Sequence, residues 1–290
     1  MLNNLPFQAF AWIASVLFTG EALLAKYISK HNIKNPWLFN LLWVFFVFVL
    51  NTAVCLWEGI TVPDKWVDII LAGVFFALAM GLFMFANNYL DISVLTPLFN
   101  FRTVFVVLLG TLFLGEVITI SQYWLIGLMV VSGIIISLDE KFAKTSFLSK
   151  GFGFAMAEMI TLALMALFLN RALARTDFWT VNFWYNLIGF VLIVFTWPFA
   201  KEGVKILTKF QVGNVFLMAL MGVFGNLAVL KAYESNISIS GAILSLPLSM
   251  VVVIVLSLFF PKLFEHHSWK VYAIRILAAI VLVYAGIKII

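Results

Sequence analysis

Residues 87–98 read NNYLDISVLTPL, and residues 231–248 read KAYESNISISGAILSLPL. In both segments a tyrosine closes a long apolar run, an Ile-Ser step follows, and a Pro-Leu pair comes last, although the second copy carries inserted residues. Such a recurrence between distant parts of one chain is typical of an internal repeat. We therefore predict two related halves, residues 1–145 and residues 146–290.

The composition around these segments is that of a membrane protein. Of the 290 residues, 64% are hydrophobic and 11% are charged, and the mean hydropathy is +1.11. Soluble domains are about half apolar and about a quarter charged. No globular core of this chain could bury so much apolar surface. The sequence therefore predicts an integral membrane protein.

Apolar runs of about 17 to 25 residues follow one another through the chain, and about 20 helical residues cross a hydrocarbon core of about 30 Å. Most tryptophans lie near the ends of these runs, as expected of an aromatic belt at the lipid headgroups. The connections are short and leave no room for a separate soluble domain. The expected transmembrane helices are residues 7–28, 37–57, 67–88, 93–114, 120–138, 151–173, 179–199, 212–232, 239–260 and 269–289.

Five helices per half is an odd number, so the second half must enter the membrane with a polarity opposite to that of the first. The predicted fold class is therefore all-α integral membrane, with ten transmembrane helices arranged as two inverted five-helix repeats. In transporters built from inverted repeats, the substrate site lies at the interface between the repeats, near the middle of the bilayer.

One part of the first half is similar to a known family. The stretch from Tyr89 to Gly133, with Gly115-Glu116 at the end of the fourth expected helix, resembles the EamA repeat of the drug/metabolite transporter superfamily. The second half is EamA-like but degenerate, because Pro261-Lys262 replaces the Gly-Glu pair. The resemblance implies a secondary transporter or exchanger that works by alternating access. Family members carry amino acids, amines, sugars, nucleotides and drugs, so the resemblance implies no single substrate.

Motifs of soluble enzymes are absent from the sequence. It contains no phosphate-binding glycine loop, no HExxH, no CxxC and no Gly-x-Ser-x-Gly. The histidines, His31, His266 and His267, fall in loops, and Cys55 is the single cysteine. The net charge of +5 is scattered over many loops. We therefore expect no enzymatic activity, no cofactor, no metal site and no nucleic-acid partner.

Four charged residues lie well inside expected helices, away from their ends: Glu21, Arg102, Glu158 and Arg275. Charges at such positions are costly, by about 2.5 to 3.5 kcal/mol for Arg or Asp, and usually face a bundle interior or a cavity. With ten antiparallel helices, all four lie roughly 9 to 14 Å below the same membrane surface. The sequence therefore predicts one layer that holds two acids and two bases.

Two interpretations of this layer stay open. The four residues form structural salt bridges between the halves, or they line a cavity in which an arginine binds a substrate carboxylate or phosphate and a carboxylate couples transport to protons. Glu21 is the favoured coupling acid, because it follows Gly20 where the family has a small, uncharged segment.

Six other residues lie where a substrate path would pass: Asn87, Asn186, Asn226, Lys231, Trp12 and Trp184. Asn87 and Lys231 occupy equivalent places in the two halves, so they are candidates for lining opposite ends of a substrate path. The other two asparagines are candidates for ligand contact, with hydrogen bonds between helices as the alternative. The tryptophans lie deep enough to form an aromatic wall for a cation.

The function that these features favour is secondary active transport, as an exporter or exchanger, of a small zwitterionic or anionic metabolite such as an amino acid, by alternating access in a prokaryotic plasma (inner) membrane. Proton coupling is part of this hypothesis, and the expected partners are the small-molecule substrate and membrane lipid. The alternatives are a flippase for a lipid-linked headgroup and a non-transporting membrane scaffold or receptor. The sequence indicates neither the substrate nor the oligomeric state.

Basic residues are more numerous at one membrane surface than at the other. The first surface carries eleven: Lys26, Lys30, Lys34, Lys141, Lys144, Lys150, Lys201, Lys205, Lys209, Lys262 and Lys270. The opposite surface carries five: Lys65, Arg171, Arg175, Lys231 and Lys288. The positive-inside rule would place the first surface in the cytoplasm and both termini outside, whereas the family resemblance implies termini inside. The orientation is therefore open.

Overall fold

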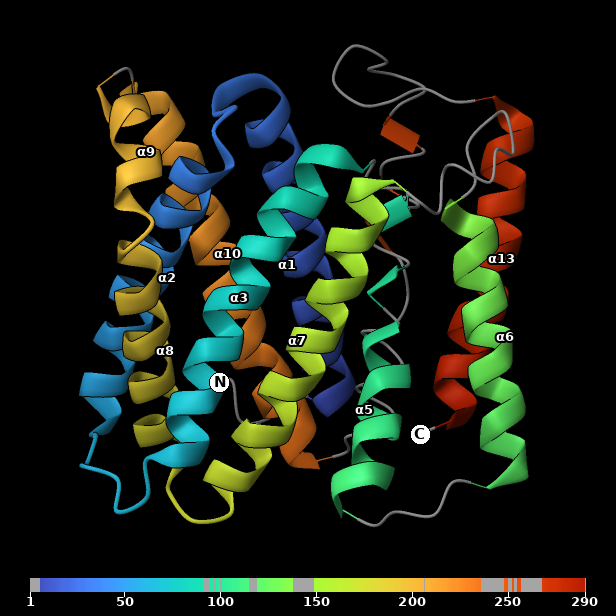
Figure 1. Cartoon of the computed structure of the whole chain (residues 1–290), viewed down its shortest axis with the longest axis horizontal. Helices are drawn as coiled ribbons and strands as arrows, with labels where there is room; N and C mark the ends of the chain where they lie inside the picture. The colour runs from blue at the N-terminus through green and yellow to red at the C-terminus, as the bar shows by residue number, and fades with distance from the viewer. Residues whose placement is uncertain are drawn as a thin grey trace.

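The computed structural model describes residues 6–90, 94–95, 98–99, 101–114, 119–137, 149–205, 207–235, 248–249, 252, 255–256 and 268–289 (Figure 1). Within these ranges the chain is helical and has no strand. The expected all-α class is therefore confirmed. The helices are α1 (Phe7–Tyr27), the π-helical turn η2 (Ile28–Asn32), α2 (Pro36–Glu58), α3 (Val67–Tyr89), α5 (Phe101–Leu114), α6 (Ile120–Ser137), α7 (Lys150–Leu173), α8 (Phe178–Val194), α9 (Trp197–Val204), α10 (Lys209–Ser235) and α13 (Trp269–Ile289).

Several of these helices are long and apolar enough to cross a bilayer. Five qualify individually, namely α1 with η2, α2, α3, α7 and α10, and the bent pair of α8 and α9 makes a sixth if it is counted as one span. The chain is therefore an integral, multi-pass membrane protein. The expected helix 239–260 lies almost wholly outside the described residues, so the count of ten stays a prediction.

Polar side chains fix where several helices begin. The Asn35 side chain accepts hydrogen bonds from the amides of Trp37 and Leu38, and Pro36 occupies the first turn of α2. Ser149 caps α7 in the same way, and Asp177 caps α8. These caps satisfy amides that have no partner inside the helix, and they hold the helix ends at the membrane surfaces.

The seventh expected helix, residues 179–199, is broken in the structure. Helix α8 ends at Val194, and α9 leaves it at an angle of 73°. Pro198 lies in the first turn of α9 and has no amide hydrogen to donate to the carbonyl of Val194. Thr196 also donates its hydroxyl to the carbonyl of Ile193, at 2.6 Å. A local proline therefore ends what the apolar run alone predicted as one helix.

The strongest helix contacts join elements from the two predicted halves. Helix α3 packs most extensively against α7, and α1 against α10. Further contacts between the halves are those of α3 with α8 and of α2 with α10. Helix α6 also packs against α13, at one side of the bundle (Figure 1). Glycines permit close approach in the α3–α8 contact: a β-carbon on Gly73 would lie 2.7 Å from Ile188 Cβ and 2.9 Å from the carbonyl of Tyr185.

The bundle has two ends, which we name by residues that lie there. At the Asp68 end, α2 and α7 finish and α3 and α8 begin. At the Gln211 end, η2 and α3 finish and α2, α7 and α10 begin. The Gln211 end is the one that carries the larger number of basic residues in the sequence.

Candidate functional site

Glu21 lies inside the bundle, at the contact between α1 and α10. Its side chain is half-buried, and a β-carbon added to Gly222 of α10 would stand 2.5 Å from its Oε1. The indole of Trp43, from α2, faces the same carboxylate. Among the described residues, no acceptor lies within hydrogen-bond geometry of its Nε1–H. Because η2 extends α1 to Asn32, Glu21 is about 16 Å from the end of this helical segment. Glu21 thus lies near the middle of the helical segment Phe7–Asn32.

Glu158 is more completely enclosed. Its side chain, on α7, is 2% exposed, and within the described part of the chain its Oε2 has no hydrogen-bond partner. It lies two helical turns from Gly151, on the same face of α7, and Gly151 packs tightly against Tyr89 and Leu90 of α3. Burying an ionised carboxylate without partners is costly, so this position favours a group that takes up a proton or meets a cation.

The two arginines of the expected layer are in different surroundings. Arg275 lies on α13 and is 3% exposed, whereas Arg102 is exposed near the start of α5. Helix α13 packs on α6, and α5 packs on α7, the helix that carries Glu158. Three of the four charges are thus wholly or partly withdrawn from the surface. That all four line one cavity stays a prediction.

Asn87 belongs to a buried cluster that ties α3 to α1. Its Nδ2 donates to Ser29 Oγ at 3.2 Å, and its carbonyl accepts from Lys26 Nζ, also at 3.2 Å. Lys26 Nζ also donates to the carbonyl of Leu90 at 2.6 Å. The lysine is only 5% exposed and caps the C-terminus of α3, where the helix dipole favours a positive charge. The cluster holds the two helices together at the Gln211 end.

Asp68 forms ion pairs with two arginines at the other end of α3. Its carboxylate lies 3.1 Å from Arg171 Nε and 3.4 Å from Arg175 Nη1, and both arginine side chains are about half exposed. Asp68 is in the first turn of α3 and Arg171 in the last turn of α7, so both helix dipoles favour these charges. These pairs connect the two halves at the Asp68 end.

Other hydrogen bonds also cross between the halves at both ends. At the Asp68 end, Thr180 Oγ1 accepts from the amide of Thr61 at 2.9 Å, and the indole of Trp184 donates to the carbonyl of Thr61 at 2.9 Å. At the Gln211 end, the side chain of Gln211 donates to the carbonyl of Asn32 at 2.7 Å, and Asn35 donates to the carbonyl of Phe199 at 2.9 Å. Polar contacts between the two halves are thus present at both ends.

Asn186 is part of an asparagine cluster between α2 and α8. Its Nδ2 donates to the carbonyl and to Oδ1 of Asn182, at 2.8 and 3.0 Å. Asn182 in turn donates to Asn51 Oδ1 at 2.8 Å and contacts Cys55 Sγ at 3.7 Å. All four residues are buried, and Asn51 Nδ2 has no partner within the described residues. The cluster cross-links α2 and α8, and Asn51 Nδ2 is its one donor without an acceptor among the described residues.

The remaining predicted site residues are dispersed. Asn226 and Lys231 are exposed on α10, and Trp12 is exposed on α1. Trp184 is half-buried, and its ring packs edge-on against Trp66 with a centroid distance of 4.9 Å. Trp184 therefore has a role in holding the loop between α2 and α3. A ligand contact for any of these residues stays a prediction.

The sequence did not identify Lys26 or Asp68 as residues that connect helices, although Asn87, a partner of Lys26, was a candidate site residue. Because they lie at the ends of apolar runs, Lys26, Arg171 and Arg175 were counted as charges of the membrane surfaces. The available signal was the sign of the charge at each helix end: Asp68 opens one helix, and Arg171 closes another that runs antiparallel to it. Among the described residues no group of three His, Cys, Asp or Glu side chains is placed to hold a metal ion.

Comparisons with known proteins are consistent with this arrangement. One solved structure, described as "Crystal structure of protein", superposes with a TM-score of 0.54 at 15% identity and covers 98% of this chain and 95% of its own. This likeness shows the fold and carries no function. No curated protein matches the chain. Residues 7–138 match the EamA-like transporter family, whose members are membrane transporters of small solutes and not enzymes. Over residues 7–138, just under half of the chain, the resemblance inferred from the sequence is thus confirmed, because this part matches the model of the EamA-like transporter family.

Proposed function

We propose that this protein is a secondary active transporter, an exporter or exchanger, that moves a small zwitterionic or anionic metabolite by alternating access in a prokaryotic plasma membrane. The observation that carries the proposal is the reciprocal packing of helices from the two halves. One buried or half-buried carboxylate lies on a helix of each reciprocal pair.

The reciprocity follows from numbering the expected helices in each half. In that numbering α1 and α10 are helices 1 and 8, and α7 and α3 are helices 6 and 3. Exchanging the halves turns the α1–α10 contact into the α7–α3 contact, and the α2–α10 contact into the α8–α3 contact. The pairings α2–α8 and α6–α13 are unchanged by the exchange. This pattern supports two inverted repeats related by a pseudo-two-fold axis in the membrane plane.

The carboxylates supply the chemistry of coupling. Glu21 lies in the α1–α10 contact and Glu158 on the equivalent helix α7. An enclosed carboxylate is stabilised by a proton or by a cationic group of the substrate, such as the ammonium of an amino acid. Arg275, also buried, is suited to the substrate carboxylate, because a guanidinium binds carboxylates through two parallel hydrogen bonds. A substrate that carries both charges would match both partners.

Alternating access requires that the polar contacts at the two ends break in turn. The Asp68 end is closed by the pairs of Asp68 with Arg171 and Arg175. The Gln211 end is closed by the Gln211 and Asn35 hydrogen bonds. Individually these partly exposed contacts are weak, about 0 to 1 kcal/mol for a surface pair, so a modest difference in substrate affinity between the two states is sufficient to shift the balance between them.

The test is uptake of radiolabelled amino acids, amines and organic anions into proteoliposomes, with and without an imposed pH gradient. We expect wild-type uptake of at least one zwitterion or anion, weaker substrate binding in Arg275→Ala and Arg102→Ala, and loss of stimulation by the gradient in Glu21→Gln. Glu202→Gln is the matched control, because Glu202 is exposed on α9.

Three outcomes would contradict the proposal in different ways. Undiminished flux in both arginine variants would remove the charged layer from the mechanism. Equal gradient dependence in Glu21→Gln and Glu202→Gln would exclude Glu21 as the coupling acid and direct the same test to Glu158. Failure of every soluble substrate, together with transbilayer movement of a lipid-linked headgroup, would favour the flippase.

A further inference from the structure

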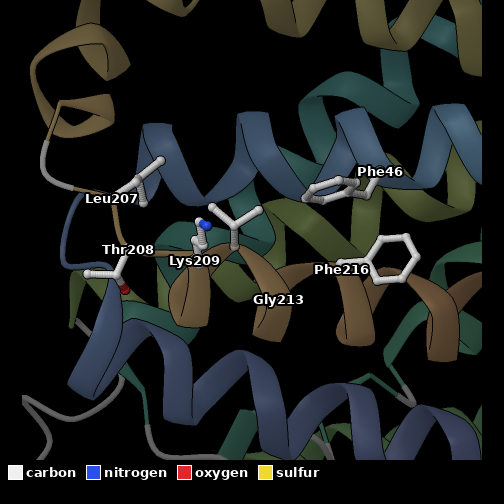
Figure 2. Close-up of a pocket in the computed structure, with 7 residues that line it drawn as sticks. Phe46, Leu207, Thr208, Lys209, Gly213 and Phe216 are labelled. Carbon is white, nitrogen blue, oxygen red and sulfur yellow. The ribbon is translucent and has the colours of Figure 1, made fainter.

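A groove opens on the outer side of the bundle at the Gln211 end, between α2 and α10 (Figure 2). Its volume is about 440 Å³, within the range of about 300 to 1,000 Å³ that holds a small-molecule ligand. Its lining residues are Phe46, Leu207, Thr208, Lys209, Val212, Gly213 and Phe216. None of them belongs to the charged layer or to the contacts that close the two ends.

The groove has a polar end and an apolar end. Figure 2 shows the Lys209 amine and the Thr208 hydroxyl together at one end and the rings of Phe46 and Phe216 at the other. Lys209 is the first residue of α10, at the membrane surface, and Phe216 lies about 10 Å deeper along the same helix. Phe46 and Phe216 meet edge to face with a centroid distance of 5.3 Å. The groove therefore descends from the headgroup level into the hydrocarbon.

Local structure keeps the polar end in place. Thr208 and Gln211 form a reciprocal cap: the Thr208 amide donates to Gln211 Oε1 at 2.9 Å, and the Gln211 amide donates to Thr208 Oγ1 at 3.3 Å. Gln211 is also anchored to the carbonyl of Asn32. Gly213 leaves the middle of the groove open, because a β-carbon there would have no atom within 4 Å.

We propose that this groove binds one anionic phospholipid, with the phosphate at Lys209 and Thr208 and one acyl chain along Val212, Gly213 and Phe216. Charge complementarity identifies the occupant. Lys201 is exposed on the preceding helix α9 and Lys205 just after it, with the exposed Glu202 between them, so this corner of the more basic membrane surface carries three lysines and one glutamate. A lysine near the membrane attracts anionic lipid, whereas in a zwitterionic lipid such as phosphatidylcholine the choline cation offsets the charge of the phosphate.

The probe is native mass spectrometry of the detergent-purified protein titrated with phosphatidylglycerol or phosphatidylcholine. We expect the wild type to retain phosphatidylglycerol in preference. Lys209→Gln should weaken that binding about fivefold, and Lys65→Gln, the same change at an exposed lysine of the Asp68 end, should not. Gly213→Phe should fill the groove and lose the lipid. Gly153→Phe is its control, because Gly153 lies at the same membrane surface, near the start of α7, and is equally open.

Each alternative has its own signature. Equal retention of the two lipids would overturn the proposal, because the groove would then hold an acyl chain without selecting its headgroup. Equal effects of Lys209→Gln and Lys65→Gln would exclude Lys209 as the phosphate partner. A dimer that Gly213→Phe dissociates would show that a second copy of the chain covers the groove. Transport activity does not enter the test, so failure of the proposed function would leave this result unaffected.

Discussion

Cys55 is a natural reporter for opening of the Asp68 end. It is the single cysteine of the chain, it is fully buried, and it lies three residues before the end of α2. If the Asp68 contacts hold this end closed, weakening them should expose the thiol to a water-soluble maleimide. We predict that Asp68→Asn accelerates modification of Cys55, because the neutral amide no longer forms ion pairs with Arg171 and Arg175.

The size of the effect follows from the geometry. Two ion pairs are lost, and both arginines are about half exposed, so each pair contributes about 0.2 to 1 kcal/mol. Together they stabilise the closed state by about 0.4 to 2 kcal/mol. Since 1.4 kcal/mol corresponds to a factor of ten in an equilibrium constant, modification should accelerate about 2- to 30-fold when opening is fast relative to the chemical step.

The assay is the rate of maleimide modification, followed by mass spectrometry on protein in detergent or proteoliposomes. Asp64→Asn is the matched control, because Asp64 is an exposed carboxylate of the loop that precedes α3. Gln211→Ala weakens the opposite end and should leave the Cys55 rate unchanged or lower it. The reasoning is refuted if Asp68→Asn and Asp64→Asn react equally fast, or if the rate in every variant merely follows its thermal stability.

Three further predictions concern stability, measured by thermal unfolding in detergent. Gly73→Ala should destabilise the protein by about 1 to 3 kcal/mol, because its β-carbon would press on Ile188 and on the Tyr185 carbonyl. Gly153→Ala, with open space around it, should be neutral or stabilising by up to about 1 kcal/mol. Equal unfolding midpoints of the two variants would contradict the close α3–α8 packing. Lys26→Met keeps the side-chain length but removes the cap of α3, and it should lower the free energy of unfolding by about 1 to 3 kcal/mol. Its control is Lys34→Met, at an exposed loop position, which should lower it by less than about 0.5 kcal/mol. Asn182→Leu should cost about 1 to 3 kcal/mol, because it leaves the buried Asn51 Oδ1 without its donor and removes one of the two acceptors of Asn186 Nδ2. The double variant with Asn51→Leu should cost less than the sum of the single changes, and strict additivity would show that Asn51 and Asn182 are not coupled.

Local hydropathy was sufficient to predict where several of the helices begin. The structure begins α3 at Val67, α7 at Lys150 and α13 at Trp269, within one residue of the expected starts. The reason is that a helix in lipid satisfies its own backbone hydrogen bonds, so its length depends on the apolar run and not on its neighbours. The exception at residues 179–199 is also local, because Pro198 breaks the helix. Glu21 and Glu158 were identified in the same way, since a charge within an apolar run is conspicuous in any sequence.

The partners of these groups depend on tertiary structure. The chain shows a lysine at position 26 and an aspartate at position 68, but burial of the first and the two arginine partners of the second arise only when α1, α3 and α7 pack side by side. A polar group at the end of an apolar run is equally compatible with water, with a lipid headgroup and with the end of a neighbouring helix, and only the packing decides among them. Glu158 is buried for the same reason: the apolar run around it required a helix, and the packing of α7 into the bundle enclosed its carboxylate.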